Sequence, residues 1–380
     1  MKNVILLGLV SFFSDISSEM VYPIIPLYLT SVFGATPALV GLIEGIAESL
    51  ASLLKVFSGY VTDRYKRKKP IAFFGYATGL VYKIALIMAS SWAGILSARV
   101  IDRLGKGIRT APRDVMVSES ADQNQMGTAF GVHKALDMAG SALGILIAYF
   151  LLLSARGTFD FRRLFLISMI PVGLSLAIFP LIEEKREHKI IKRDPFWHNL
   201  RNIDGQLKLY LLVAFLFTLG NSSNAFLLLR AKSVGFNDTS VILLYFIYNL
   251  TASLLAMPLG RMSDLVGRKK LLVSGYIVFA MVYFGFALAF NKQFMIVLFV
   301  LYGIYAAMIA GVERAFIAEI SPSALKGTML GLHSTIVGIA LLPASIIAGV
   351  LWTTFGPEVT FTFGSCLSLA AALVLFLLMK

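Results

Sequence analysis

Two seven-residue stretches decide the fold of this chain: GTAFGVH at residues 127–133 returns as GTMLGLH at residues 327–333. A second motif, GYVTDRYKRK at residues 59–68, returns as GRMSDLVGRK at residues 260–269. The copies are 200 residues apart for the first motif and 201 apart for the second. Self-similarity at one long separation is the signature of an internal repeat. We therefore expect a chain built from two equivalent halves.

The composition excludes an ordinary soluble domain. Of the 380 residues, 58% are hydrophobic and 14% are charged, whereas soluble domains carry roughly 45–50% apolar and about 25% charged residues. Because a helix needs about 20 residues to cross the hydrocarbon of a bilayer, the apolar stretches predict membrane-spanning helices. Twelve are expected, at residues 4–32, 37–60, 70–90, 92–113, 126–154, 160–181, 208–231, 238–260, 269–290, 293–318, 328–352 and 357–379.

The repeat places six of these segments in each half, so both halves enter the membrane from the same side. Parallel six-helix repeats with a solute site between them are a common transporter architecture. We therefore expect an all-α membrane protein with twelve transmembrane helices in two parallel six-helix repeats. The predicted boundaries are an N-terminal half at 1–182, a cytoplasmic linker at 183–207 and a C-terminal half at 208–380.

Basic residues predict how the chain is oriented. With the N-terminus inside, the cytoplasmic segments hold 21 Lys and Arg residues and the opposite side holds six. Because positively charged loops stay in the cytoplasm, we expect both termini and the linker to be cytoplasmic, in a multi-pass protein of the cell membrane. The net charge of +13 is then mainly a label of topology, and no nucleic-acid partner is expected.

The two loop motifs carry a family resemblance. Residues 59–68 resemble the signature cytoplasmic loop of the major facilitator superfamily, and residues 260–269 resemble its weaker second copy. Together with the repeat and the twelve segments, the resemblance covers nearly the whole chain and implies solute transport by alternating access. Two positions depart from the pattern: Lys66 stands where the first loop usually has Gly, and Leu265 where the second usually has a basic residue.

The loop motifs also predict a gate. Arg67 can reach a carboxylate on a neighbouring segment, and Glu119 is the expected partner. The resemblance implies that such charge networks lock the two halves together on the cytoplasmic side while the protein faces outward. The alternative is a set of exposed loop charges worth under about 1 kcal/mol per pair. The candidate gating residues are Gly59, Asp63, Arg64, Arg67, Glu119, Gly260, Asp264, Arg268 and Glu319.

Charged residues inside the spans are concentrated in the first half. Six carboxylates and six Lys or Arg side chains fall within its segments, whereas the second half offers Glu313 and Arg314. Charges in hydrocarbon are costly and mark a pathway or a buried pair. The candidate substrate and proton pathway consists of Asp15, Glu19, Glu44, Glu48, Arg99, Asp102, Arg103, Lys134, Asp137, Asn221 and Asn224.

Helical spacing refines this set. Asp15 and Glu19 are four residues apart and share a face. Two carboxylates on one face repel in hydrocarbon unless a cation or a proton is shared. A static lattice of ion pairs remains the alternative for each charged residue. The resemblance implies that an arginine in the fourth span is linked to proton coupling; Arg99 is the best match, and Arg103 also fits because Gly107 follows it by four residues.

Two histidines occupy matching positions of the repeat, His133 and His333. Histidine titrates near neutral pH, so a proton relay is one reading of these positions. The alternative is a packing histidine bonded to a carbonyl.

The function that these observations favour is secondary active transport of a small solute by alternating access, coupled to a proton. Proton-driven efflux of amphiphilic drugs and uniport or symport of an anionic metabolite both remain open. An integral membrane enzyme is a remote alternative that leaves the duplicated loop unexplained. No nucleotide-binding loop, cofactor motif or metal site is found in the sequence. The expected partners are membrane lipid, the solute and a proton, and we expect a monomer.

Overall fold

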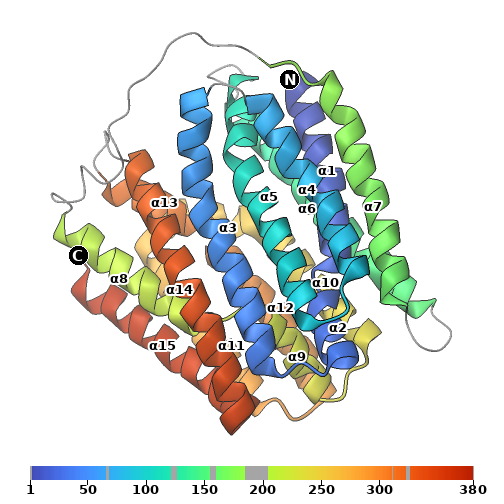
Figure 1. Cartoon of the computed structure of the whole chain (residues 1–380). Coiled ribbons are helices and arrows are strands. Elements are labelled where there is room, and N and C mark those ends of the chain that lie inside the picture. The colour runs from blue at the N-terminus through green and yellow to red at the C-terminus, as the bar shows by residue number, and fades with distance from the viewer. Residues whose placement is uncertain are drawn as a thin grey trace. The chain divides into compact units, whose positions relative to one another are not determined.

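The computed structural model describes residues 2–65, 68–120, 126–154, 160–184, 204–309, 311–321 and 326–379. Within these ranges every regular element is a helix (Figure 1). The chain divides into two compact units. Unit 1 comprises Met1–Ala35 and Ile46–Ile191, and unit 2 comprises Thr36–Gly45 and Lys192–Lys380.

The helices of unit 1 follow one another along the chain, and the first turns of α3 belong to unit 2. They are α1 (Lys2–Val21), α2 (Ile24–Phe33), α3 (Pro37–Tyr65), α4 (Lys68–Met88), α5 (Trp92–Glu119), α6 (Met126–Leu153) and α7 (Phe161–Ile178), followed by the short 3₁₀ helix η2 (Phe179–Leu181).

The remaining helices form unit 2. They are α8 (Gly205–Gly220), α9 (Ala225–Ser233), α10 (Asp238–Val266), α11 (Arg268–Leu288), α12 (Lys292–Ile309), α13 (Val312–Ile320), α14 (Lys326–Phe355) and α15 (Pro357–Leu378).

Each of the twelve expected spans coincides with a helix or a broken helix pair. In the described residues, eleven helices are long and apolar enough to cross a membrane. The twelfth expected span, 92–113, corresponds to α5, a continuous helix of 28 residues. Because α5 carries Arg99, Asp102 and Arg103, its hydropathy alone does not identify it as a membrane-spanning helix. Its charges must therefore find partners inside the protein.

The same helices pack together in both units. α1 packs against α6 and α7, and α4 packs against α5 and α7. At the equivalent places of the repeat, α8 packs against α14 and α15, and α11 packs against α12 and α15. The duplicated sequence thus folds into two bundles with the same helix neighbours.

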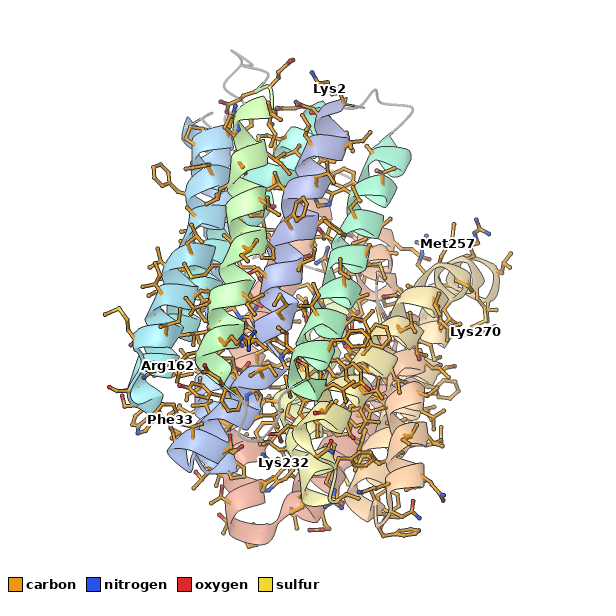
Figure 2. All side chains as sticks on the ribbon, turned by 90° about the vertical axis from the view of Figure 1, so that its right-hand side faces the viewer. Lys2, Phe33, Arg162, Lys232, Met257 and Lys270 are labelled. Atoms are coloured by element: carbon orange, nitrogen blue, oxygen red, sulfur yellow. The ribbon has the colours of Figure 1, made fainter. Side chains whose placement is uncertain are left out.

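The first span is broken once. Lys2 lies at one end of unit 1, and Phe33 and Arg162 lie at the other (Figure 2). Between α1 and α2, Tyr22 and Pro23 interrupt the helix, because proline removes a backbone donor and clashes with the preceding turn. The break brings Tyr22 into the polar interior described below.

The number of residues between equivalent positions of the two halves changes by one in one loop. α3 and α10 are 201 residues apart, whereas α4 and α11 are 200 apart. Two residues separate α3 from α4, but only Gly267 separates α10 from α11. Gly267 has φ +100°, a conformation that only glycine adopts readily. The structural counterpart of Arg268 is therefore Lys68, not the Arg67 that the motif alignment suggests.

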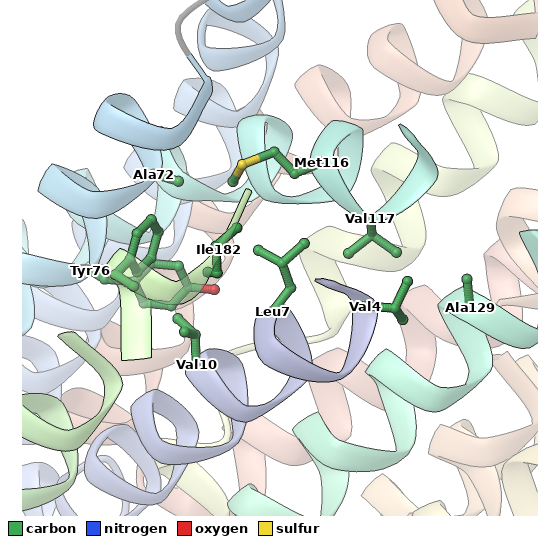
Figure 3. Packing of buried hydrophobic residues seen from close by; sticks show 10 residues of the cluster. Val4, Leu7, Val10, Ala72, Tyr76, Met116, Val117, Ala129 and Ile182 are labelled. Atoms are coloured by element: carbon green, nitrogen blue, oxygen red, sulfur yellow. The ribbon is translucent and has the colours of Figure 1, made fainter. Parts of the chain in front are cut away.

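An apolar core closes one end of unit 1. Val4 and Leu7 of α1 pack there with Tyr76 of α4, Val117 of α5 and Ile182 after η2 (Figure 3). Each of these side chains is at most 1% exposed. The Tyr76 ring belongs to this core, whereas its hydroxyl reaches the polar cluster of the site.

Close contact between α1 and α6 depends on two glycines. A Cβ atom at Gly140 would overlap the carbonyl oxygen of Phe12, and one at Gly144 would overlap that of Ile16. Small residues four apart let membrane helices approach to backbone contact. This contact holds the polar residues of α1 against those of α6.

Gly144→Ala is expected to lower the free energy of unfolding by about 1–3 kcal/mol, because the new methyl group forces α6 away from α1. The matched control is Gly173→Ala in α7, where no atom lies within 4 Å of the added Cβ. The control should leave stability unchanged or raise it by up to about 1 kcal/mol. Unfolding in mixed detergent micelles measures both. Equal stability of the two variants would contradict the close helix contact.

Candidate functional site

Ion pairs between α3 and α5 form one charged cluster of unit 1. Arg103 Nη2 lies 2.6 Å from Glu48 Oε1. Asp102 lies 3.8 Å from Arg103 Nε and 3.7 Å from Arg99 Nη1. Arg99 is 1% exposed. Buried charges at this density are tolerated only when they are paired, so these residues form one linked network.

Aromatic rings complete this network. The guanidinium carbons of Arg99 and Arg103 lie 5.3 and 5.6 Å from the ring centroid of Tyr22, at the break between α1 and α2. An arginine within about 6 Å of an aromatic centroid is attracted to the ring face. Lys83 of α4 is also buried, with its Nζ 4.4 Å from the centroid of Tyr82.

A second polar cluster joins α1, α4, α5 and α6. Arg109 Nη1 donates to Ser14 Oγ at 2.7 Å, and its guanidinium carbon lies 4.4 Å from the Tyr76 ring centroid. Asp15 of α1 interacts electrostatically with Asp137 of α6 and with Arg109. Two carboxylates that lie 122 positions apart in the sequence are thus within electrostatic range of each other.

The second cluster contains a chain of hydrogen bonds. Ser11 Oγ lies 2.9 Å from Tyr76 Oη and 3.1 Å from His133 Nε2. The other imidazole nitrogen, Nδ1, lies 4.0 Å from Asp137 Oδ1. All four side chains are buried.

The remaining predicted pathway residues of α1, α3 and α6 occupy three different environments. Glu19 is half-buried on α1. Glu44 is 1% exposed and lies in the part of α3 that belongs to unit 2, whereas Glu48, one turn later, belongs to unit 1. The Lys134 side chain is 68% exposed, with its Nζ 3.7 Å from Asp137 Oδ2.

In unit 2, hydroxyl and amide groups replace ion pairs around a helix break. α8 ends at Gly220 and α9 begins at Ala225. Asn221 Nδ2 donates to Tyr305 Oη at 3.1 Å, and Tyr302 Oη donates to Asn224 Oδ1 at 2.9 Å. Both predicted asparagines are therefore held by tyrosines of α12.

The rest of this region is aromatic. Phe217 stacks on Tyr276 with centroids 4.0 Å apart, and Phe279 stacks on Tyr283 at 3.9 Å. Tyr276 Oη donates to Glu313 Oε1 at 3.2 Å. The polar groups of unit 2 are thus embedded in stacked rings.

After α3 and after α10, the described residues of the two repeated motifs form matching ion pairs. Glu119 pairs with Lys68, and Arg268 Nη1 lies 2.9 Å from Glu319 Oε2. The expected partner of Glu119, Arg67, lies outside the described residues. The surroundings of four further candidates are also outside the description: Gly59, Asp63, Arg64 and Asp264. No described atom lies within 4 Å of a Cβ placed on Gly260, so Gly260 is not a site of close packing.

The sequence reasoning missed a second loop contact that also repeats. Lys69 Nζ donates to the carbonyl of Ile182 at 2.6 Å, and Lys269 Nζ donates to that of Met379. The separation of 200 between Gly75 and Gly275 was the signal that could have aligned these lysines. Each cation reaches carbonyls beyond the last helix of its unit, where partial negative charge gathers.

The fourth expected span, 92–113, ends before α5 does. α5 continues to Glu119, and Arg109 is 8% exposed inside unit 1. Hydropathy alone does not reveal the internal partners that such a charge needs. The described residues hold no group of three or more His, Cys, Asp or Glu side chains arranged to bind a metal ion.

The ion pair in the interior of unit 1 and the ion pair at the loop of unit 2 are expected to differ in coupling energy. A double-mutant cycle with Glu48→Gln and Arg103→Gln should give a coupling energy above about 1.5 kcal/mol, because the Arg103 side chain is 6% exposed and its charge has little access to water. The same cycle with Glu319→Gln and Arg268→Gln should give less than about 1 kcal/mol, because both side chains are partly exposed. Unfolding in mixed micelles supplies the four stabilities of each cycle. A weaker coupling at the buried pair would contradict the network.

Comparisons with known proteins identify the family. The Major Facilitator Superfamily model matches residues 7–223 and 209–380. The chain is 38% identical over 380 residues to an uncharacterized MFS-type transporter of Methanocaldococcus jannaschii. The alignment covers 98% of this chain and 94% of that transporter. It is 23% identical over 360 residues to an uncharacterized protein of Mycobacterium tuberculosis, covering 92% of this chain and 87% of that one.

Solved structures share the fold. The nucleoside transporter NupG matches with a TM-score of 0.82 at 13% identity, covering 100% of both chains. The D-xylose-proton symporter matches with a TM-score of 0.78 at 16% identity, covering 99% of this chain and 97% of that one. These matches confirm the predicted all-α fold class. With its two matching halves, its twelve helical spans and a relative along nearly its whole length, the chain belongs to the major facilitator superfamily of membrane transporters.

Proposed function

We propose that the protein is a proton-coupled secondary active transporter that moves a small solute by alternating access. The observation that carries the proposal is that Asp137, which is buried, lies within electrostatic range of Asp15, which is half-buried on α1. Two neighbouring carboxylates in a low-dielectric interior repel each other unless one of them takes up a proton. Such a pair is a natural place for proton uptake and release.

The ion pairs around Arg103 have a different proposed role. Arg103 and Arg99 already lie within 4 Å of carboxylates, so their charges are balanced within unit 1. A network of this kind holds α1, α3 and α5 in one arrangement. The charges of this network would then stay the same when Asp15 or Asp137 takes up a proton.

Alternating access requires a gate, and the loop ion pairs are the proposed gate residues. Lys68–Glu119 and Arg268–Glu319 occur at the same places in the repeat, which supports a shared role. The proposed topology places both termini and the linker in the cytoplasm, in a monomer of the cell membrane. This placement follows from the excess of basic residues in the loops.

The solute class remains divided between an amphiphilic compound and an anionic metabolite. The stacked rings of unit 2, such as Phe217 on Tyr276, suit an amphiphile with an apolar or aromatic body. An anion would need a cation that is available to it, and Arg99 and Arg103 are engaged with carboxylates. The amphiphile is therefore the favoured candidate, and export is the corresponding direction.

Proton coupling predicts the effect of neutralising Asp15. A panel of cationic amphiphiles and anionic metabolites is first tested for thermal stabilisation of the purified protein, since a ligand of the folded state raises its stability. Flux of the stabilising compound into proteoliposomes should increase at least tenfold under an imposed pH gradient, and Asp15→Asn should abolish this increase. Asp238→Asn, which removes a carboxylate that pairs with Lys232 at the first residue of α10, serves as the control. Flux that ignores the gradient in the native protein would exclude proton coupling.

The gate predicts a separate phenotype. Asp63→Asn should leave the melting temperature within a few degrees of the native value but stop net flux, because the substitution removes one charge of the proposed gating motif. The same flux assay with and without a gradient measures it. Unchanged flux in Asp63→Asn would contradict a gating role for the loop.

A further inference from the structure

We propose that His133 and Asp137 together bind one exchangeable proton, with Ser11 and Tyr76 fixing the imidazole. This inference deepens the proposed proton coupling and rests on it for its role in transport. The binding of the proton itself is a separate claim that can be measured without any solute.

The geometry makes His133 and Asp137 a pair. They are four residues apart on α6 and therefore lie on one face of the helix. Nδ1 of His133 and Oδ1 of Asp137 are 4.0 Å apart, within reach of a small side-chain rotation. The exposed fractions are 4% for His133 and 8% for Asp137. A charge on either group is therefore poorly solvated; the other carboxylate oxygen of Asp137, Oδ2, lies 3.7 Å from Lys134 Nζ.

Asp137 presents an unsatisfied acceptor to the histidine. Among the described residues, its Oδ1 atom is buried and has no hydrogen-bond partner. A buried acceptor without a partner costs roughly 1–3 kcal/mol, and more when it is charged. A proton on Nδ1 of His133, or on the carboxylate itself, removes this cost. A proton shared between the two groups therefore satisfies this acceptor.

The other side of the imidazole is anchored. Nε2 lies 3.1 Å from Ser11 Oγ, and Ser11 Oγ lies 2.9 Å from Tyr76 Oη. A hydroxyl can both donate and accept, so this pair can bond to Nε2 whether or not it carries a hydrogen. The ring orientation is therefore maintained in both protonation states.

The proton can move within the pair without a co-reactant. In the charged state, the imidazolium of His133 faces the carboxylate of Asp137. Transfer breaks the Nδ1–H bond and forms an Oδ1–H bond, so that the imidazolium and carboxylate become a neutral imidazole and a carboxylic acid. Nε2 keeps its hydrogen bond to Ser11 throughout.

Charged groups from every packed helix surround the pair. Arg113 and Asp114 of α5 bring one positive and one negative charge within electrostatic range of His133. Asp15 of α1 repels the Asp137 carboxylate, so a proton on the pair relieves that repulsion. The titratable and charged groups near the pair are Asp15 on α1, Tyr76 on α4, Arg109, Arg113 and Asp114 on α5, and Lys134 on α6.

The second half of the repeat provides a natural control. His333 is buried and stacks on Tyr210, with centroids 6.1 Å apart. Its Nε2 has no hydrogen-bond partner among the described residues. Val337 stands where the first half has Asp137. The same histidine thus occurs once with a carboxylate and a hydroxyl chain, and once with neither.

The test uses the full chain with ¹⁵N-labelled histidines in lipid nanodiscs, titrated between pH 5 and 9 without solute. His133→Gln and His333→Gln assign the two buried rings. His133 should show one protonation transition, and Asp137→Asn should move its midpoint to lower pH by at least one unit, because the carboxylate no longer stabilises the imidazolium. The His333 signals should be the same in both proteins. A His133 transition that is absent in the native protein, or unmoved by Asp137→Asn, would overturn the proposal.

A second variant guards against a folding failure of Asp137→Asn. Ser11→Ala keeps the fold but removes the hydroxyl, so the Nε2 shift of His133 should move while that of His333 stays. An unchanged Nε2 shift would overturn the anchoring role. Gradient-insensitive flux with an intact His133 transition would overturn the coupling and leave the pair standing. Gradient-driven flux with a His133 that shows no protonation transition would overturn the pair and leave the coupling standing.

Discussion

The contact on which unit 1 depends is the ion pair between Arg103 and Glu48. A charge in hydrocarbon costs several kcal/mol unless it is paired or reaches water. α5 carries so many charges that hydropathy does not recognise it as a span, yet it is a continuous helix. Its neighbours supply what it needs: Glu48 from α3, the Tyr22 ring from the break after α1, and Ser14 of α1 as an acceptor for Arg109.

Unit 2 has the same helix neighbours but a different interior. At the position of Arg113 the repeat has Glu313, and at the position of Asp137 it has Val337. Stacked aromatic rings and amide–tyrosine hydrogen bonds fill the space that ion pairs occupy in unit 1. The two bundles share an architecture that the repeat dictates, while their side chains differ in charge. This difference is the basis for assigning the proton to unit 1 and an amphiphilic solute to the rings of unit 2 in the proposed function.

The spans could be predicted from the sequence because hydropathy and length are local properties. The expected segment 126–154 matches α6 within one residue. The breaks were harder to predict. Pro23 marks the one after α1, but the break at residues 221–224 has no proline, and its asparagines are held by tyrosines of a distant helix. The partner of Glu119 was also out of reach, since a one-residue difference in loop length shifts the alignment from Arg67 to Lys68.

The residues of the candidate site could be predicted from the sequence, but only some of the contacts between them could. Spacing along one helix correctly links Arg99 with Asp102, because residues three apart are neighbours on a helix. Contacts between helices, such as Ser11 with His133, depend on the close approach that Gly140 and Gly144 permit. No local pattern encodes which faces meet at that approach.

The central claim is that unit 1 takes up and releases a proton through its paired carboxylates. The most direct measurement is the transient current of the reconstituted protein on a solid-supported membrane after a pH jump, with no solute present. The account predicts a charge displacement in the native protein that is lost when Asp15 and Asp137 are both replaced by Asn. A native protein without this current, or a double variant that retains it, would contradict the account.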